Sequence, residues 1–306
     1  MRAVRKAFTE TLLELARKDP CIFAVATDSR GSVTLSEFAQ ELPQQFVECG
    51  IAEQDAIGIG AGLACTGLRP FVCGPASFYS LRSAEQIKID VAYCHQNVKI
   101  IGVSGGVSYG ALGSTHHAVQ DIALMRAIPG LQVVLPADAN AAVQLTRALA
   151  SSNEPAYVRM GRNAVEDVYP PYASFTIGKA NVLREGTDLT IVACGELVLP
   201  ALCAAEKLNQ RGIAVSVLDM HTIKPLDRGA ICRAAQMGPI LTIEEHSVLG
   251  GLGAAVAEVV CQEWPTKMRI MGLPDEVLYT GESKEVFVHY GLTAEGIAQS
   301  AEELLQ

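Results

Sequence analysis

The stretch FVECGIAEQDAIGIGAGLACTGLRPFVC, residues 46–73, decides the fold class, because it contains one complete strand–helix–strand unit. Its two ends, residues 46–49 and 70–73, are short apolar runs of the kind that form buried strands. The residues between them, 52–66, are mostly small and apolar and have the length of a helix. A helix that links two buried strands belongs to a parallel sheet, so this stretch predicts an α/β fold.

The same alternation runs through the rest of the chain. In the first half, further strands are predicted at 22–27, 98–104, 133–135 and 156–160, and helices near 3–18, 81–95, 118–128 and 138–150. The segment Tyr169-Pro-Pro-Tyr172 is stiff and extended and interrupts the pattern. Strands at 189–194, 214–219, 240–244 and 268–272 then alternate with helices near 197–211, 227–237 and 251–263. We expect two α/β domains with mainly parallel sheets, residues 1–170 and 171–306.

Composition and net charge exclude several classes of binding partner. The 306 residues are 49% hydrophobic, which is enough apolar material for large cores and excludes disorder. A net charge of −9 repels nucleic acid and anionic membranes. The nine cysteines form no C-x-x-C pair, as is usual in a reducing compartment, and no uncharged apolar run reaches the ~18 residues of a membrane span. We expect a soluble, cytoplasmic protein that binds neither nucleic acid nor membrane.

Two glycine patterns resemble catalytic motifs. Gly58, Gly60 and Gly62 lie inside a predicted helix, whereas a dinucleotide-binding fingerprint needs its glycines in the turn before the helix. The segment Gly102-Val-Ser104-Gly-Gly matches the G-x-S-x-G motif after a strand, which makes a serine hydrolase one hypothesis. A long glycine-rich loop follows Ser104, however, where a nucleophile elbow would turn directly into a helix.

Glu53 is the most distinctive acidic residue. It lies in the first turn of a predicted helix of small apolar residues, where a carboxylate is poorly solvated. By itself it could be an acid that the helix dipole favours at a helix N-terminus. Its neighbours point to a more specific role.

Five motifs follow one another along the first half: Gly50-Ile-Ala-Glu53-Gln-Asp-Ala, Arg69-Pro-Phe71, Ser77-Phe78, Gly113-Ser-Thr-His116 with residues 121–130, and Leu135-Pro-Ala-Asp138. In this order they resemble the pyrimidine-binding domain of transketolase and 1-deoxyxylulose-5-phosphate synthase. The second half contains the motif of residues 219–227, and Glu244-Glu-His246 before Gly250-Gly-Leu-Gly253. It is similar to the transketolase C-terminal domain, where we expect Lys224, Asp227, His221 and residues 244–246 to have structural and interface roles. The resemblance is collinear over nearly the whole chain.

The resemblance implies a thiamine diphosphate cofactor. Glu53 occupies the family's position for the carboxyl that bonds to ring nitrogen N1′ and lets the 4′-amino group act as a base. Phe78 would stack on the aminopyrimidine, Leu81 and Ile51 would close the apolar slot, and Asp28 matches a position near the cofactor. His116 matches the family histidine that points at the substrate end of the thiazolium ring, so Glu53 and His116 are the expected catalytic residues.

The resemblance also implies a substrate site. Arg5 and Arg162 match the two arginines that hold a substrate phosphate, and Ser32 matches a position at the substrate entrance. The chain departs from the family at Ser104, where a histidine is usual, and at Leu112, where an aspartate reads a sugar hydroxyl. Because Leu112 cannot form a hydrogen bond, we expect the acceptor to be a smaller, branched or deoxygenated aldehyde rather than ribose 5-phosphate.

The family's diphosphate-binding domain carries Gly-Asp-Gly and a later Asn, and this chain has no Gly-Asp-Gly. We expect it to be the C-terminal subunit of a split transketolase, without metal ligands of its own. An N-terminal subunit would bind the diphosphate and Mg²⁺ in an α2β2 assembly. The reaction would transfer a two-carbon ketol unit between sugar phosphates or small aldehydes.

Three alternatives stay open. One is the beta subunit of a 2-oxo acid dehydrogenase decarboxylase component, although Gly113-Ser-Thr-His116 looks more like the sugar-transferring branch. Another is the Ser104 hydrolase. The last is a non-catalytic binding subunit, which would have no need of Glu53.

Overall fold

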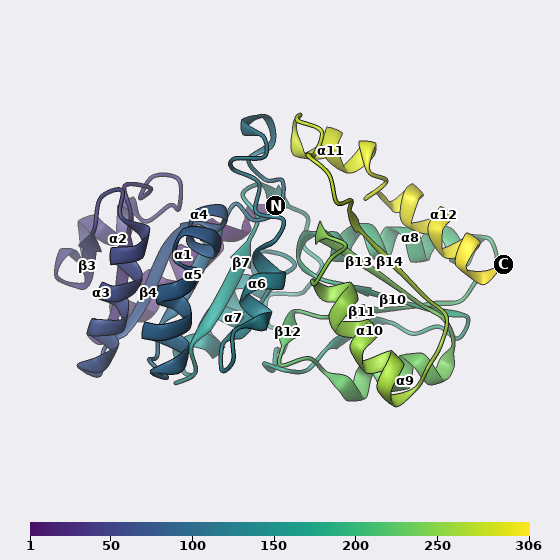
Figure 1. Cartoon of the computed structure of the whole chain (residues 1–306), viewed down its shortest axis with the longest axis horizontal. Coiled ribbons are helices and arrows are strands. Elements are labelled where there is room, and N and C mark those ends of the chain that lie inside the picture. The colour runs from purple at the N-terminus through teal and green to yellow at the C-terminus, as the bar shows by residue number, and fades with distance from the viewer.

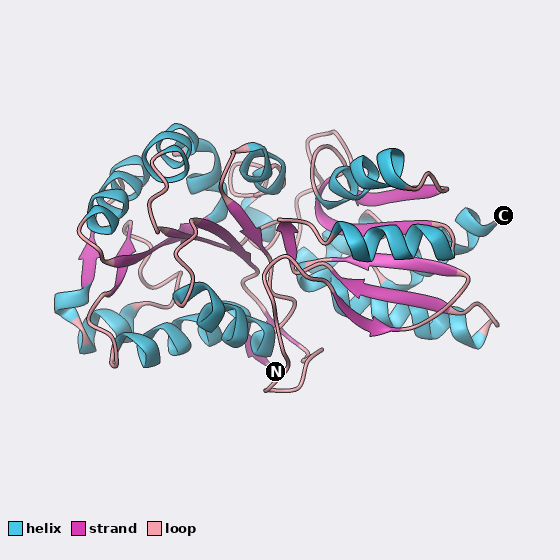
Figure 2. Ribbon diagram, turned by 90° about the horizontal axis from the view of Figure 1, so that it is seen from below, coloured by secondary structure: helices cyan, strands magenta, loops and turns pink.

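The computed structural model describes residues 1–306 as two sheets that lie side by side, each with helices on both faces (Figures 1 and 2). The first sheet has seven strands in the order β12-β6-β7-β5-β4-β2-β3. Their bounds are Thr222–Lys224, Gln132–Val134, Ala156–Met160, Lys99–Val103, Arg69–Pro75, Ile22–Ala26 and Phe46–Glu48, in that order. All neighbours are parallel except β12, which is antiparallel to β6.

The helices of the first half cover both faces of this sheet. One apolar core lies under α1 (Val4–Ala16) and α7 (Ala139–Ala150). Another lies under α3 (Glu53–Cys65) and α6 (Asp121–Ala127), together with the π-helical turn η2 (Ile87–Tyr93). The short helices α2 (Ser36–Glu41), η1 (Pro43–Gln45), α4 (Ala76–Arg82), α5 (Ala84–Gln86) and η3 (Gly110–Leu112) complete this half.

The second sheet has five strands in the order β14-β13-β10-β11-β9, with bounds Met268–Leu273, Ile240–Ser247, Leu189–Ala193, Val215–Asp219 and Asn181–Arg184. Only β9 is antiparallel. Helices α8 (Val198–Gln210) and α12 (Ala294–Leu305) pack into one core, and α9 (Arg228–Met237) and α10 (Leu252–Glu263) pack into the other. The small elements are η4 (Gly195–Leu197), α11 (Ser283–His289) and the two-stranded sheet of β1 (Arg2–Ala3) and β8 (Ala164–Val165).

The two halves are joined more closely than the sequence predicts. Strand β12 belongs to the second half of the chain but pairs with β6 in the first sheet. Each apolar core contains residues from both halves, for example Phe8 with Val286 in one and Ile57 with Ile231 in the other. The fold class is confirmed as two α/β units with mainly parallel sheets.

Three details differ from the predicted elements. The expected helix 81–95 is divided into α4, α5 and η2, and the helix expected at 118–128 begins only at Asp121. Helices α2, α11 and α12 and strands β1, β8, β9 and β12 were not predicted. No helix has both the length and the apolar character that crossing a membrane requires.

Candidate functional site

Most of the predicted site residues gather at one edge of the first sheet, because they follow the carboxyl ends of neighbouring parallel strands, whereas Arg5 lies in the first turn of α1. Asp28 follows β2, Glu53 follows β3, Phe78 follows β4, the loop from Ser104 to His116 follows β5, and Arg162 follows β7. The register brings these ends level, since Val103 pairs with both Pro75 and Met160. Ligands of open α/β sheets bind at this edge.

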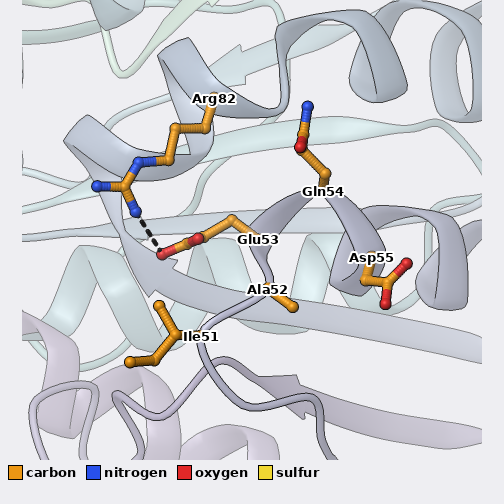
Figure 3. Close-up of a pocket in the computed structure, with 6 residues that line it drawn as sticks. All are labelled: Ile51, Ala52, Glu53, Gln54, Asp55 and Arg82. Carbon is orange, nitrogen blue, oxygen red and sulfur yellow. Dashed lines mark hydrogen bonds and ion pairs between the residues drawn. The ribbon is translucent and has the colours of Figure 1, made fainter.

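Glu53 and Arg82 lie side by side in the wall of a pocket of about 540 Å³ at the start of α3 (Figure 3). Glu53 is the first residue of the helix and is 7% exposed. Arg82 ends α4 and points toward it, with Nη1 3.1 Å from Oε1 of the carboxylate. Arg82 therefore supplies the partner that the poorly solvated carboxylate requires.

A row of aromatic and arginine side chains, each in contact with the next, begins at Arg82. Its guanidinium lies over Phe78, 4.1 Å from the ring centroid, in cation–π geometry. The rings of Phe78 and His116 lie 5.4 Å apart edge to face, and His116 and Tyr109 lie 5.4 Å apart in the same manner. The Arg162 guanidinium then lies 5.4 Å from the Tyr109 centroid. The row thus leads from the buried carboxylate to a cationic end.

The cationic end contains Arg5 and Arg162. Arg5 donates to the backbone carbonyl of Ser32, which brings these three predicted substrate residues together. Burial, and then the positive charge of Arg162, lowers the pKa of Arg5. Its Nε atom is buried without a hydrogen-bond partner. Two neighbouring guanidinium groups concentrate the positive charge that suits an anion such as phosphate.

The remaining predicted residues are placed less centrally. Asp28 has a positive φ of 51°, and its amide donates to the Glu48 carboxylate at 2.7 Å. Ile51 and Leu81 do not form a closed slot within this chain, since they are 78% and 60% exposed, and Leu112 is also exposed. Exposed apolar side chains such as these are available for contact with another protein surface.

Ser104 does not have the surroundings of a nucleophile. It is 1% exposed, and its hydroxyl has no hydrogen-bond partner. A hydrolase serine needs an exposed hydroxyl bonded to a base. The geometry therefore gives no support to the hydrolase hypothesis.

Neither Arg82 nor Tyr109 was predicted from the sequence as a site residue. The signal for Arg82 was its place four residues after Phe78, where one helical turn puts a side chain over its neighbour. No group of three or more His, Cys, Asp and Glu side chains is arranged to hold a metal ion. What the site offers is a buried carboxyl, an aromatic ring beside it and an end with two neighbouring arginines.

Comparison with known proteins identifies this arrangement. Residues 1–167 match the family model of the transketolase pyrimidine-binding domain, and residues 178–297 match that of the transketolase C-terminal domain. The chain belongs to the transketolase family. The predicted fold and the predicted class of enzyme, a thiamine diphosphate-dependent transketolase, are confirmed. No observation favours the 2-oxo acid decarboxylase or the non-catalytic alternative.

Several relatives match this transketolase chain over nearly their whole length. One of the subunits of the apulose-4-phosphate transketolase of Phocaeicola vulgatus is 57% identical and is covered to 98% of its length by 100% of this chain. The 6-deoxy-6-sulfo-D-fructose transketolase subunit SqwH of a Clostridium species is 38% identical, with 99% of this chain and 94% of the relative aligned. A solved structure described as a split gene transketolase, an inactive beta4 tetramer, has a TM-score of 0.92 at 38% identity and covers 100% of this chain and 99% of its own.

Proposed function

We propose that this chain is the subunit of a split transketolase that holds the aminopyrimidine end of thiamine diphosphate. A separate N-terminal subunit would hold the diphosphate and Mg²⁺, in an α2β2 assembly. The row from Glu53 to Arg162 carries the proposal, because it provides a proton-sharing carboxyl, a ring for stacking and an anion site in that order. Relatives of subunit length, covered to 98% and 94%, support a divided enzyme.

The cofactor end is formed by α3 and α4. When bound, thiamine diphosphate supplies an electron sink that allows the bond beside a carbonyl carbon to break. The Glu53 carboxyl would hold a proton at ring nitrogen N1′, and Arg82 would keep that carboxyl in position. Phe78 would stack on the aminopyrimidine through the ring face that Arg82 does not cover. Ile51 and Leu81 close the slot once the partner subunit covers their exposed side chains, and Asp28 lies at its margin.

The substrate end is formed by the glycine-rich loop and the two arginines. His116 Nδ1 lies 2.9 Å from the Thr115 hydroxyl, which leaves Nε2 to exchange a proton with a substrate oxygen. Arg5 and Arg162 bind the substrate phosphate, with Ser32 at the entrance. The chain's own residues thus bind both ends of a sugar phosphate and move protons at its oxygens.

For the substrate we propose a branched sugar phosphate, with apulose 4-phosphate as the first candidate. The 57% identity to a subunit of a transketolase named for that compound supports this choice. Leu112, which stands where the family has an aspartate that reads a sugar hydroxyl, supports a substrate pair other than one with ribose 5-phosphate, whereas Ser104 is buried and does not reach the substrate. Loss of the two-carbon ketol unit from this branched ketose would leave a three-carbon ketone phosphate.

The test is a steady-state comparison with the chain and its partner subunit reconstituted in thiamine diphosphate and Mg²⁺. Apulose 4-phosphate with glyceraldehyde 3-phosphate is compared with xylulose 5-phosphate and ribose 5-phosphate. We expect the higher kcat/KM for the branched donor, with a ketone phosphate as product. A higher kcat/KM for the pair that contains ribose 5-phosphate would refute the substrate proposal and leave the transketolase proposal standing.

A further inference from the structure

Val107 lies in the glycine-rich loop. Side chains from the second half of the chain form hydrogen bonds with both its backbone amide and its backbone carbonyl. The Glu245 carboxylate, on β13, accepts a hydrogen bond from the Val107 amide at 2.7 Å. The Ser283 hydroxyl, at the start of α11, donates to the Val107 carbonyl at 3.0 Å. Val107 is buried, Ser283 is half-buried, and the Val107 carbonyl also accepts from the Gly110 amide at 2.8 Å within the loop. Figure 1 shows α11 beside this loop, although the two are far apart in the sequence.

Glu245 is itself fixed by a buried arginine. Arg159, on β7, donates to the Glu245 backbone carbonyl at 2.6 Å and lies 3.6 Å from its carboxylate. The Arg159 Nε atom also lies 3.3 Å from the Asp121 carboxylate. A Cβ atom on Gly106 would fall 2.1 Å from the Glu245 carboxyl carbon. The loop is therefore seated against Glu245 with no room for a side chain between them.

We infer that Glu245 and Ser283 are positioning residues for the substrate site. Val107 lies two residues before Tyr109 on the loop that also carries His116, and the two rings contact each other. Moving Val107 would displace these rings from Phe78 and Arg162, which are carried by other elements. The C-terminal half thereby sets the distance between the cofactor end and the anion end of the site.

This inference rests on the proposed function. It predicts that the hydrogen bonds to Val107 affect substrate binding but not proton exchange at the cofactor. Glu53 and Arg82 lie on α3 and α4 and form no hydrogen bond with Val107, Glu245 or Ser283. Weakening the anchor should therefore raise KM for the sugar phosphate and leave proton exchange at the cofactor C2 unchanged. A residue needed only for folding would affect both together.

The test compares Ser283→Ala with Ser216→Ala. Ser216 is a matched control, because its hydroxyl also donates to a backbone carbonyl, that of Arg184 at 3.1 Å, within the second sheet. In the full chain, hydrogen exchange of the peptide 104–117 should be about tenfold faster in Ser283→Ala only. In the reconstituted complex, KM for the sugar phosphate should rise about tenfold in the same variant, with C2 exchange unchanged. Ser283→Thr should restore both values.

Glu245→Gln is the second variant, because it keeps an oxygen for the Val107 amide and removes the charge beside Arg159. It should raise KM less than Glu245→Ala. The inference is overturned if Ser283→Ala matches Ser216→Ala in loop exchange and KM, or if KM and C2 exchange change together. If the wild-type complex shows no transketolase activity while the loop exchange responds as described, the proposed function fails and the loop anchor stands.

Discussion

Replacing Glu53 by Gln should lower the catalytic rate and leave the stability of the protein nearly unchanged. Glu53 pairs with Arg82 at 3.1 Å, but the Arg82 side chain is 51% exposed, so water screens the pair. Such a pair stabilises a protein by less than about 1 kcal/mol, and we expect Glu53→Gln to fold and assemble. The amide cannot share a proton with ring nitrogen N1′, and removal of such a group lowers a rate by about 10²–10⁴. That loss equals about 3–5 kcal/mol of transition-state stabilisation.

The assay has two readouts on the reconstituted complex: steady-state transketolase rate and hydrogen–deuterium exchange at the cofactor C2. Both should fall together in Glu53→Gln, with little change in the melting temperature. Asp55→Asn is the matched control, because Asp55 lies in the same turn of α3 and lines the same pocket but is exposed. C2 exchange at the wild-type rate in Glu53→Gln would show that the carboxyl only stabilises the start of the helix.

Three further outcomes follow from the site and its surroundings. Arg5→Ala and Arg162→Ala should each raise KM for phosphorylated substrates by about 10–100-fold and leave that for glycolaldehyde nearly unchanged; equal effects on both substrates would exclude an anion site there. Leu112→Asp should raise kcat/KM for ribose 5-phosphate about tenfold, and no gain would show that Leu112 does not face the acceptor hydroxyl. Burial, and then the charge of Glu245, raises the pKa of Glu196 from 4.5 to about 8. The folded state then binds this proton more tightly than the unfolded state, so the melting temperature should fall as the pH rises from about 5 to 8, and less so in Glu196→Gln.

The strand–helix–strand unit at 46–73 could be predicted closely because its signals are local. Residues 52–66 were predicted as a helix, and α3 covers Glu53–Cys65. Strand β12 could not be predicted in the first sheet, because its three residues pair with β6 only through the tertiary fold. Periodicity likewise gave no sign of the π-helical turn at Ile87–Tyr93.

The site could be predicted only as far as the family motifs extend. The structure brings Phe78 and His116 together, and it brings Arg5 close to Arg162, as their motifs suggested. Arg82 lies outside those motifs, and its contact with Glu53 joins two different helices, α3 and α4. The contacts of Val107 depend on residues more than a hundred positions away, which no local pattern encodes.

Calorimetric titration with thiamine diphosphate measures whether the cofactor site is divided between two subunits, as proposed. This chain contributes a carboxyl and a stacking ring, and the charged diphosphate requires the partner. We predict weak or undetectable binding to the chain alone with Mg²⁺ present, and tight, Mg²⁺-dependent binding to the mixture of the two subunits. Tight, Mg²⁺-dependent binding by this chain alone would contradict the account.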